Sequence, residues 1–293
     1  MKKAFIQLHI AIFLAGFTAV LGKLIGLNEG LLVWYRLLLT VLVLGVWMGF
    51  SKALVKLPLK AILQTTAVGM IIVFHWVCFY GSIKYANASV ALVCLSAAGF
   101  FTALLEPLLF RKSVVWGELL LGLLAVAGIY IIFDFHPQYK TGIVFGILSS
   151  FGSALFPIFN KQLLKWHAPQ VLTLYELGGG LIMLTLFLPL YLYFFPASYY
   201  LPTTHDWQWL LVLAVVCTVI CFDLQLHALK KISPFTANLS YNLEPVYGII
   251  LAFIFLGESK LLKVPFYAGV ALIITAVVLQ MLRVRLQQKP IEK

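Results

Sequence analysis

One carboxylate lies in the middle of a long apolar stretch near the end of the sequence. Glu244 follows the polar residues of the range 238–242 and directly precedes Pro245. A charge in hydrocarbon costs about 2.5–3.5 kcal/mol on insertion scales, so a residue kept there commonly has a function. Proline removes a backbone donor and leaves a carbonyl unbonded, which makes the helix polar at this point. The pattern predicts a carboxylate that binds a substrate or a proton, unless a Lys or Tyr holds it purely for packing.

Other polar and aromatic side chains in apolar stretches are candidates for the same cavity. His75 titrates near neutral pH when unperturbed, which suits proton coupling, although a lone His on an apolar helix is commonly a bonded core residue. Asn160 follows Pro157, another proline inside an apolar stretch. We expect these residues to line a substrate cavity: His75, Trp76, Tyr80, Asn160, Asn238, Tyr241, Asn242 and Glu244.

Three further charges are better explained by gating or coupling. Arg36 and Glu176 each lie near the start of an apolar stretch, at roughly equivalent places in the two halves of the sequence. Asp223 lies toward the end of another stretch, where a Lys near the membrane surface is its expected partner. Such residues either contact the substrate or close a gate by pairing with an opposite charge. We therefore assign Arg36, Glu176 and Asp223 to gating or coupling.

The sequence as a whole is too apolar for a soluble protein. Of its 293 residues, 62% are apolar or aromatic and 11% are charged, against about 25% charged in ordinary soluble domains. A globule of this size needs a polar shell that these residues do not supply. The four cysteines all lie in apolar runs, which indicates small core residues and no disulfide or zinc framework. The composition indicates an all-α polytopic protein embedded in the lipid bilayer.

Ten apolar stretches have the length of about 20 residues that a membrane helix needs. With the N-terminus in the cytoplasm, 15 Lys and Arg residues fall at cytoplasmic ends of these stretches and four at the opposite ends. This excess of positive charge on one side predicts that both termini are cytoplasmic. The ten ranges are 5–27, 31–50, 61–81, 86–110, 114–133, 141–164, 171–195, 207–227, 234–256 and 264–282.

The two halves of the sequence repeat one pattern. Residues 85–96 correspond to 231–242 at a displacement of 146, and residues 15–23 correspond to 153–161 at a displacement of 138. Five spans per repeat is an odd number, so the second copy must insert upside down. Inverted repeats are a feature of secondary transporters, with the site near the midplane at the repeat interface. We expect ten transmembrane helices as two inverted five-helix repeats, 1–136 and 137–283, followed by a basic tail, 284–293.

The motifs of both halves resemble one family. They are Lys23 and Lys161, Trp34-Tyr35-Arg36, the links Gly81-Ser82-Ile83-Lys84-Tyr85 and His227-Ala228-Leu229-Lys230-Lys231, Glu244-Pro245, Leu256-Gly257-Glu258, and Gly269. The sequence resembles the ten-helix branch of the drug/metabolite transporter superfamily, which is built from two EamA-type repeats. It departs from the pattern at Arg111-Lys112, where Gly-Glu is usual, and at Gly99, where Pro is usual. The resemblance implies a secondary transporter of the bacterial inner membrane that exports an amino acid or a related metabolite by alternating access.

Other function classes find less support in the sequence. No Walker-type phosphate loop, no His-Glu-x-x-His helix and no Gly-x-Ser-x-Gly elbow occurs, so neither ATP drive nor hydrolysis is expected. A membrane-embedded enzyme and a non-transporting scaffold remain the alternatives, although a scaffold needs neither an inverted repeat nor a polar midplane. The expected partner is a small-molecule substrate, with no cofactor, no metal and no nucleic acid.

The oligomeric state is open between a monomer and a homodimer. The spans 114–133 and 264–282 are nearly free of charge, so this pair is able to support a dimer contact. Alternatively, Gly122, Gly128 and Gly269 allow the two helices to pack closely within one monomer.

Overall fold

The first half of the chain forms six helices, and they are separated where the sequence breaks its apolar runs. The computed structural model describes residues 2–111, 113–135, 137–229, 240–241, 243–260 and 264–287. The helices of the first half are α1 (Lys2–Leu24), α2 (Glu29–Phe50), α3 (Leu59–Tyr85), α4 (Ala88–Leu95), α5 (Ala98–Phe110) and α6 (Trp116–Phe135). Asn28 caps α2, and Asn87 caps α4 by accepting a hydrogen bond from the third residue beyond it.

The second half follows the same order. A short 3₁₀ turn, η1 (Pro137–Tyr139), leads into α7 (Lys140–Leu163) and α8 (Pro169–Phe194). The next span is built from α9 (Thr204–Leu211), the π-helix η2 (Val212–Ile220) and α10 (Cys221–Leu229). After it come α12 (Glu244–Leu256), the 3₁₀ turn η3 (Glu258–Lys260) and α13 (Val264–Gln287). Within the described ranges every regular element is helical, which confirms the all-α prediction.

Each of the ten predicted spans corresponds to a helical segment. Seven segments of the described chain are long and apolar enough to cross a membrane, with α4 and α5 forming one of them and α9 with its continuation another. Three shorter apolar helices, in α6, α12 and α13, complete the set. Large apolar side chains such as Leu186, Phe187 and Ile254 are exposed on the outside, where hydrocarbon tails replace water as their surroundings.

Two spans are interrupted at equivalent positions. The range 86–110 was predicted as one continuous helix, but a turn at Ser96–Ala97 divides it into α4 and α5. In the second half, Ser240 and Tyr241 are helical, Leu243 is a turn residue, and α12 starts at Glu244. Ala97 and Leu243 are 146 residues apart, the displacement of the repeat. Discontinuous helices in both halves are typical of transporter binding sites.

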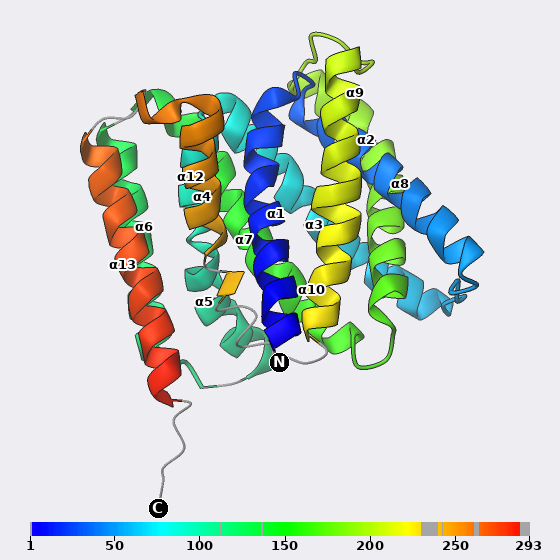
Figure 1. The fold of residues 1–293 in the computed structure, drawn as a ribbon, viewed down its shortest axis with the longest axis horizontal. Coiled ribbons are helices and arrows are strands. Elements are labelled where there is room, and N and C mark those ends of the chain that lie inside the picture. The colour runs from blue at the N-terminus through cyan, green and yellow to red at the C-terminus, as the bar shows by residue number, and fades with distance from the viewer. Residues whose placement is uncertain are drawn as a thin grey trace, which may run out of the picture.

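The contacts between helices show the exchange that an inverted repeat requires. The third helix of each half packs on the first two helices of the other half: α3 contacts α7 and α8, and the segment formed by η2 and α10 contacts α1 and α2. Figure 1 shows the pair α6 and α13 at one edge of the molecule and the pair α2 and α8 at the other. The centre is therefore formed by helices from both repeats.

The two ends of the described chain lie on the same side. Figure 1 shows the start of α1 and the end of α13 at one end of the bundle and the start of α9 at the opposite end. An even number of membrane crossings places both ends of a chain on the same side of the membrane. That this shared end faces the cytoplasm stays a prediction, as do the boundary between residues 136 and 137 and the tail.

Helix pairs that cross closely do so at glycine. A Cβ atom on Gly128 would come within 2.6 Å of the Gly269 carbonyl oxygen, so α6 and α13 pack within the monomer as one of the two sequence-based alternatives expected. A Cβ atom on Gly69 would lie 2.0 Å from the carbonyl oxygen of Glu176, which fixes the crossing of α3 and α8. The cysteines Cys78, Cys94, Cys217 and Cys221 are all buried and free, as predicted.

Candidate substrate-binding site

A buried arginine is the centre of a polar cluster between the repeats. Arg36 on α2 has only 3% of its surface exposed. Its guanidinium lies 3.6 Å from the centroid of the Trp76 ring, Nη1 donates to the Tyr80 hydroxyl at 2.9 Å, and Nε donates to the Thr218 hydroxyl at 3.0 Å. No Asp or Glu of the described residues lies within ion-pair distance of Arg36, and its Nη2 makes no hydrogen bond to them. The cation is held by an aromatic face and two hydroxyls.

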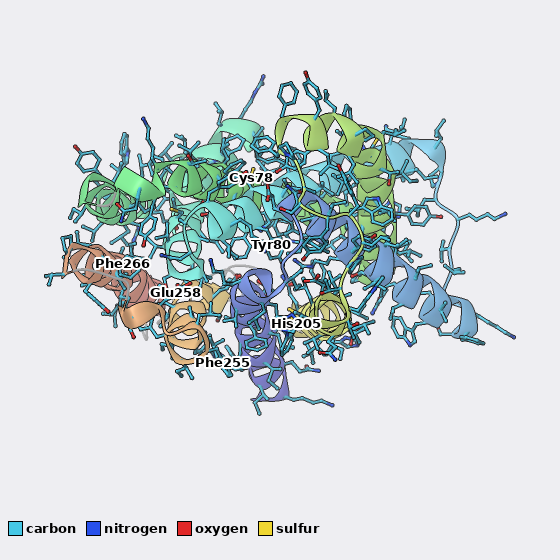
Figure 2. All side chains as sticks on the ribbon, turned by 90° about the horizontal axis from the view of Figure 1, so that it is seen from above. Cys78, Tyr80, His205, Phe255, Glu258 and Phe266 are labelled. Atoms are coloured by element: carbon cyan, nitrogen blue, oxygen red, sulfur yellow. The ribbon has the colours of Figure 1, made fainter. Side chains whose placement is uncertain are left out.

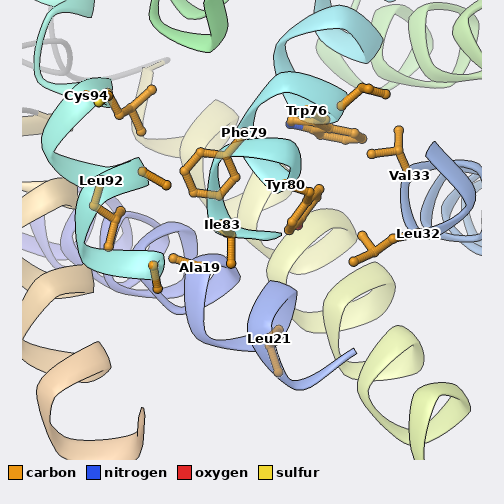
Figure 3. Packing of buried hydrophobic residues seen from close by; sticks show 14 of the residues in the cluster. Ala19, Leu21, Leu32, Val33, Trp76, Phe79, Tyr80, Ile83, Leu92 and Cys94 are labelled. Carbon is orange, nitrogen blue, oxygen red and sulfur yellow. The ribbon is translucent and has the colours of Figure 1, made fainter. Parts of the chain in front are cut away.

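The side chains around Arg36 are positioned by close packing. In Figure 3, Trp76 extends from α3 toward Val33 on α2, whereas Phe79 points to Leu92 and Cys94 on α4. Tyr80 is fully buried, and Figure 2 shows it near the middle of the molecule. Its ring occupies the space beside Gly22 of α1, where a Cβ atom would come within 2.5 Å of the ring. The predicted cavity residues Trp76 and Tyr80 are thus brought together, with Arg36 between them.

Thr218 is a member of this cluster that the sequence did not single out. It lies in the π-helix η2, and its hydroxyl donates to the carbonyl of Leu213, five residues earlier, at 2.8 Å. The same oxygen accepts from Arg36, so the widened turn supplies both a donor site and an acceptor site. Short π-helical segments occur frequently at functional sites. A lone Thr in an apolar run resembles any threonine bonded to its own helix, so the sequence carries no separate signal for it.

A narrow crevice, with room for about one water molecule, extends from Thr218 toward one end of the molecule. It lies between α2, α8 and the segment η2–α10. Besides Thr218 at its inner end, four of its lining residues have polar side chains. The lining residues are Thr40, Leu44, Gln170, Thr173, Thr218, Val219, Phe222 and Asp223. Since α2 ends and α8 begins at the end that carries the N-terminus, the crevice opens to that end.

Glu244 and Tyr241 lie together but apart from the three side chains that bond Arg36. Glu244 is the first residue of α12 and interacts with the charge of Arg36 without forming an ion pair, and none of the described residues donates a hydrogen bond to it. The Tyr241 hydroxyl is buried without a hydrogen-bond partner among those residues, and it interacts electrostatically with Glu244. The predicted neighbours Asn238 and Asn242 lie outside the described residues.

Asn160 and Glu176 form a second polar pair, in the other repeat. Glu176 on α8 is 2% exposed, and its Oε2 accepts a hydrogen bond from Asn160 Nδ2 on α7 at 3.2 Å. The other carboxylate oxygen and the Asn160 amide oxygen are both buried and have no donor in the described structure. The sequence placed one of these residues in the cavity and the other at a gate, whereas the structure joins them.

His75 joins two helices. Its Nδ1 lies 2.9 Å from both the carbonyl and the hydroxyl oxygen of Ser149 on α7, and the Ser149 hydroxyl donates back to the His75 carbonyl at 3.1 Å. The ring also packs between Phe79 and Phe156. These contacts fit a bonded core histidine, the alternative to a substrate contact that the sequence left open.

Among the described residues Asp223 contacts a histidine; Lys230 and Lys231 lie outside those residues, so the expected pairing with a lysine stays a prediction. Its Oδ1 lies 3.2 Å from His227 Nδ1, one turn along α10, and both side chains are more than a third exposed. The spacing of four residues is the one at which opposite charges meet on a helix. Asp223 therefore stands at the open end of the crevice, away from Arg36.

The opposite end of the molecule is closed by hydrogen bonds between the α1–α2 turn and the segment 191–206. Asp206 Oδ1 accepts from the Gly26 amide at 2.7 Å, Asn28 donates to the Phe195 carbonyl at 3.1 Å, and the Tyr191 hydroxyl donates to Glu29 at 2.6 Å. We call these three hydrogen bonds the latch. In addition, Lys84 at the end of α3 donates to the Ile25 carbonyl.

Asp206 is held in place by its own capping box. Thr203 donates to Asp206 Oδ2 from both its amide and its hydroxyl, at 3.0 and 2.8 Å, and the Tyr199 hydroxyl donates to the same oxygen at 2.9 Å. Burial, and then this hydrogen bond, raise the pKa of Tyr199 to about 12. The Tyr199 hydroxyl therefore remains a donor at every pH near neutral.

These features define a polytopic α-helical membrane protein whose two inverted repeats enclose polar side chains. The chain belongs to the EamA-like transporter family, whose pattern matches residues 2–134 and again residues 140–282. The two matches confirm the resemblance to two EamA-type repeats that the sequence motifs indicated.

Relatives of the chain are transporters by name. An uncharacterized transporter of Archaeoglobus fulgidus is 26% identical over 182 residues, which are 62% of this chain and 63% of that protein. The uncharacterized transporter YetK of Bacillus subtilis is 28% identical over 294 aligned positions, covering 92% of this chain and 84% of YetK. A solved crystal structure that is 15% identical has the same fold, with a TM-score of 0.65 over 96% of this chain and 98% of its own.

Proposed function

We propose that the protein is a secondary transporter that exports an amino acid or a related small carboxylate across the bacterial inner membrane by alternating access. The observation that carries the proposal is Arg36, a buried guanidinium between the repeats with no carboxylate of the described residues within ion-pair distance. A cation in such surroundings is costly unless an anion joins it. A substrate carboxylate would supply that anion, and a guanidinium binds carboxylates through two parallel hydrogen bonds.

The surroundings of Arg36 fit a carboxylate that also carries an apolar part. Trp76 covers one face of the guanidinium, which leaves the edge with Nη2 for an incoming group. Trp76 and Tyr80 add flat apolar surface next to it, and Tyr241 and Glu244 add polar atoms from the other repeat. An amino acid combines these properties, because its carboxylate is polar and its side chain is commonly not.

Alternating access is supported by the difference between the two ends. The latch joins the first repeat to the second at one end, and the crevice leads from the other end to Thr218. A transporter that opens to one side at a time needs such an asymmetry, and the inverted repeat supplies a second conformation in which the ends exchange roles.

Transport by purified protein in proteoliposomes tests the proposal. Vesicles are loaded with one unlabelled amino acid, and a trace of the same amino acid in radiolabelled form is added outside. Exchange then accumulates the label inside the vesicles. Each amino acid is compared with the amine that remains when its carboxylate is removed. We expect accumulation of at least one amino acid and none of its amine. Equal accumulation of both would contradict recognition through Arg36, and no flux for any compound would favour a scaffold.

The direction of transport is tested in cells. A host lacking its own exporters is grown on amino acids and toxic analogues, with and without the protein. Export predicts better growth with the protein than without it, whereas uptake predicts greater sensitivity.

A further inference from the structure

Glu176 is the counterpart of Arg36 in the second repeat. The sequence Leu174-Tyr175-Glu176 lies 140 residues after Trp34-Tyr35-Arg36, and each tyrosine donates to a backbone carbonyl of the loop that follows the second helix of the other repeat. Among the described residues Arg36 has three polar or aromatic partners, whereas Glu176 has one, Asn160. An acid with so little support at 2% exposure requires a physical explanation.

The hydrogen-bond inventory of this pair lacks one donor. An ionised glutamate only accepts, and an asparagine amide offers two N–H donors and one acceptor oxygen. With Asn160 Nδ2 donating to Oε2, two acceptors are left over: Glu176 Oε1 and Asn160 Oδ1, both buried and without a partner in the described chain. Leaving a buried polar atom unpaired costs about 1–3 kcal/mol, and more if it is charged.

A single proton removes both deficits. Protonation of Oε1 makes it a donor, and the amide oxygen of Asn160, which already bonds Oε2 through its Nδ2, is a buried acceptor without a donor in the described chain. The acid and the amide then form two antiparallel hydrogen bonds, N–H to Oε2 and O–H to Oδ1, after small rotations about terminal torsions that are soft. The same proton neutralises a carboxylate that none of the described cations approaches within ion-pair distance.

Water reaches the neighbourhood of this pair from one end of the molecule. A cleft of about 370 Å³ lies between the start of α3 and the end of α7. Gln162 and Leu163, which line it, lie two and three residues after Asn160 on the last turn of α7, and Asn160 is itself partly exposed. The cleft is lined by Pro58, Lys60, Ala61, Gln64, Gln162, Leu163, Trp166 and His167. Water in this cleft is thus close to the last turn of α7, which carries Asn160, the partner of Glu176.

The charged groups on neighbouring elements are engaged elsewhere. On α2, Arg36 is bonded to Thr218 and Tyr80, and on α10, Asp223 pairs with His227. On α7, Lys161 pairs with Glu106 at 3.6 Å, and on α3, His75 bonds Ser149 while Lys60 stands at the cleft. His167, in the α7–α8 connection, is a second titratable group of the cleft. The partner of Glu176 in the described structure remains Asn160.

We propose that Asn160 and Glu176 form a proton-binding site, in which Glu176 takes up one proton from the cleft and releases it once in each transport cycle. The proposal rests on the proposed transport function, and it locates coupling at this pair. The proton passes from water to Oε1 and returns to water, so no other reactant is needed.

Replacement of Glu176 by glutamine mimics the protonated state. The glutamine amide donates to Asn160 Oδ1 and its oxygen accepts from Nδ2, so Glu176→Gln should fold at least as well as the natural protein. We expect it to keep substrate exchange between identical compartments, which needs no proton release. It should lose net transport driven by an imposed pH gradient by about tenfold or more, a change within the range of common coupling free energies. Glu118→Gln, on the peripheral helix α6, is the matched control and should keep the response.

Proton movement is followed with a pH-sensitive dye enclosed in the same vesicles. Substrate should drive a pH change with the natural protein and with Glu118→Gln, but not with Glu176→Gln. Unchanged gradient response in Glu176→Gln, or a natural protein that transports substrate without responding to the gradient, would overturn the proton site and leave the transport function standing. Loss of binding in Glu176→Gln only for substrates with an ammonium group, and not for their hydroxy acids, would also overturn it, because the pair would then bind the substrate.

A spectroscopic measurement separates this proposal from the transport function. The carbonyl stretch of a protonated carboxylic acid is distinct from that of a carboxylate in the infrared. At neutral pH, the infrared difference spectrum between Glu176→Gln and the natural protein should show the loss of one such carboxylic-acid band. Asn160→Ala should shift the frequency of that band. Absence of the band would overturn the proposal even if no substrate is found, and its presence would support the site even if the proposed substrate class is wrong.

Discussion

At the scale of single residues, the two buried charges at equivalent positions of the repeats are stabilised in different ways. Arg36 is surrounded by an aromatic face and two hydroxyls, and its guanidinium offers further donors. Glu176 has one amide beside it, so it is better accommodated with a proton. The repeats therefore supply two different chemical groups in one frame, an anion-binding group and an acid.

The first prediction concerns the shape of the Arg36 side chain. Arg36→Lys keeps the positive charge but loses the planar fork and the stacking on Trp76. We expect exchange of a carboxylate substrate to fall by about 10- to 100-fold, because charge-assisted hydrogen bonds contribute about 1.5–3 kcal/mol. Initial rates in proteoliposomes measure this, and Arg111→Lys at the exposed end of α5 is the control. Natural rates in Arg36→Lys would show that only the charge matters.

The second prediction concerns Glu244. Glu244→Gln removes the charge at the start of α12 and keeps the shape, so expression and folding should be retained while flux falls by roughly tenfold, as for an intramembrane charge with a functional role. Size-exclusion elution and flux are measured on the same preparation. A folded variant with natural flux would remove Glu244 from the site, and an unfolded one would indicate a packing role.

The residues that could be predicted from the sequence are those with a local signal. Trp76 and Tyr80 stand one turn apart, which suffices to place them on one helix face. The spacing of four between Asp223 and His227 also indicates their contact, whereas the sequence analysis named only a lysine as the partner of Asp223. Thr218 and the pairing of Asn160 with Glu176 depend on how separate helices pack, and no local pattern reports that.

At the scale of elements, the spans could be predicted but their interruptions could not. Apolar length gives ten segments, and the cap Asn28 follows the predicted end of the first span, whereas Asn87, which caps α4, lies inside the predicted range 86–110. The turn at Ser96–Ala97 has neither Pro nor an adjacent charge, so hydropathy reads through it. The break before Glu244 was signalled only by Pro245, which fits the first turn of a helix as well as a kink.

A glycine substitution tests how closely α3 and α8 must approach. In Gly69→Ala the new Cβ atom would lie 2.0 Å from the Glu176 carbonyl oxygen, so the helices must separate. We expect a loss of roughly 1–3 kcal/mol in the free energy of unfolding, the common cost of overpacking. The control is Gly178→Ala, whose Cβ atom meets nothing within 4 Å and which should gain up to about 1 kcal/mol from helix propensity. Thermal unfolding in detergent compares them, and equal midpoints would mean that the crossing is adaptable.

At the scale of the whole molecule, the orientation in the membrane follows from charge. The connections that share an end with the N-terminus carry Lys52, Lys56 and Lys165, whereas Pro196–Asp206 at the other end contains no Lys or Arg. In a variant lacking the four native cysteines, Ser198→Cys should react with an impermeant maleimide in intact cells, and Lys56→Cys only after permeabilisation. The reverse pattern would invert the molecule and exchange the roles of its ends.

The latch determines which end is closed, so weakening it should shift the balance between conformations. In Asp206→Asn one of the two carboxylate oxygens becomes an amide NH2 group, which donates and does not accept. Either Thr203 and Tyr199 or Gly26 then lose their acceptor. Opening at that end should expose Cys217, which is 2% exposed and next to Thr218. With the other cysteines replaced, we expect its labelling from that side to rise about 3- to 10-fold, which corresponds to a shift of roughly 1 kcal/mol.

The control is His205→Ala, which removes a neighbouring side chain that bonds the half-buried Trp209 and not the latch, so labelling of Cys217 should stay low. Because Tyr199 keeps its proton near neutral pH, the effect should be the same at pH 6 and pH 8. Unchanged labelling of Cys217 in Asp206→Asn would mean that helix packing, and not these hydrogen bonds, keeps this end closed.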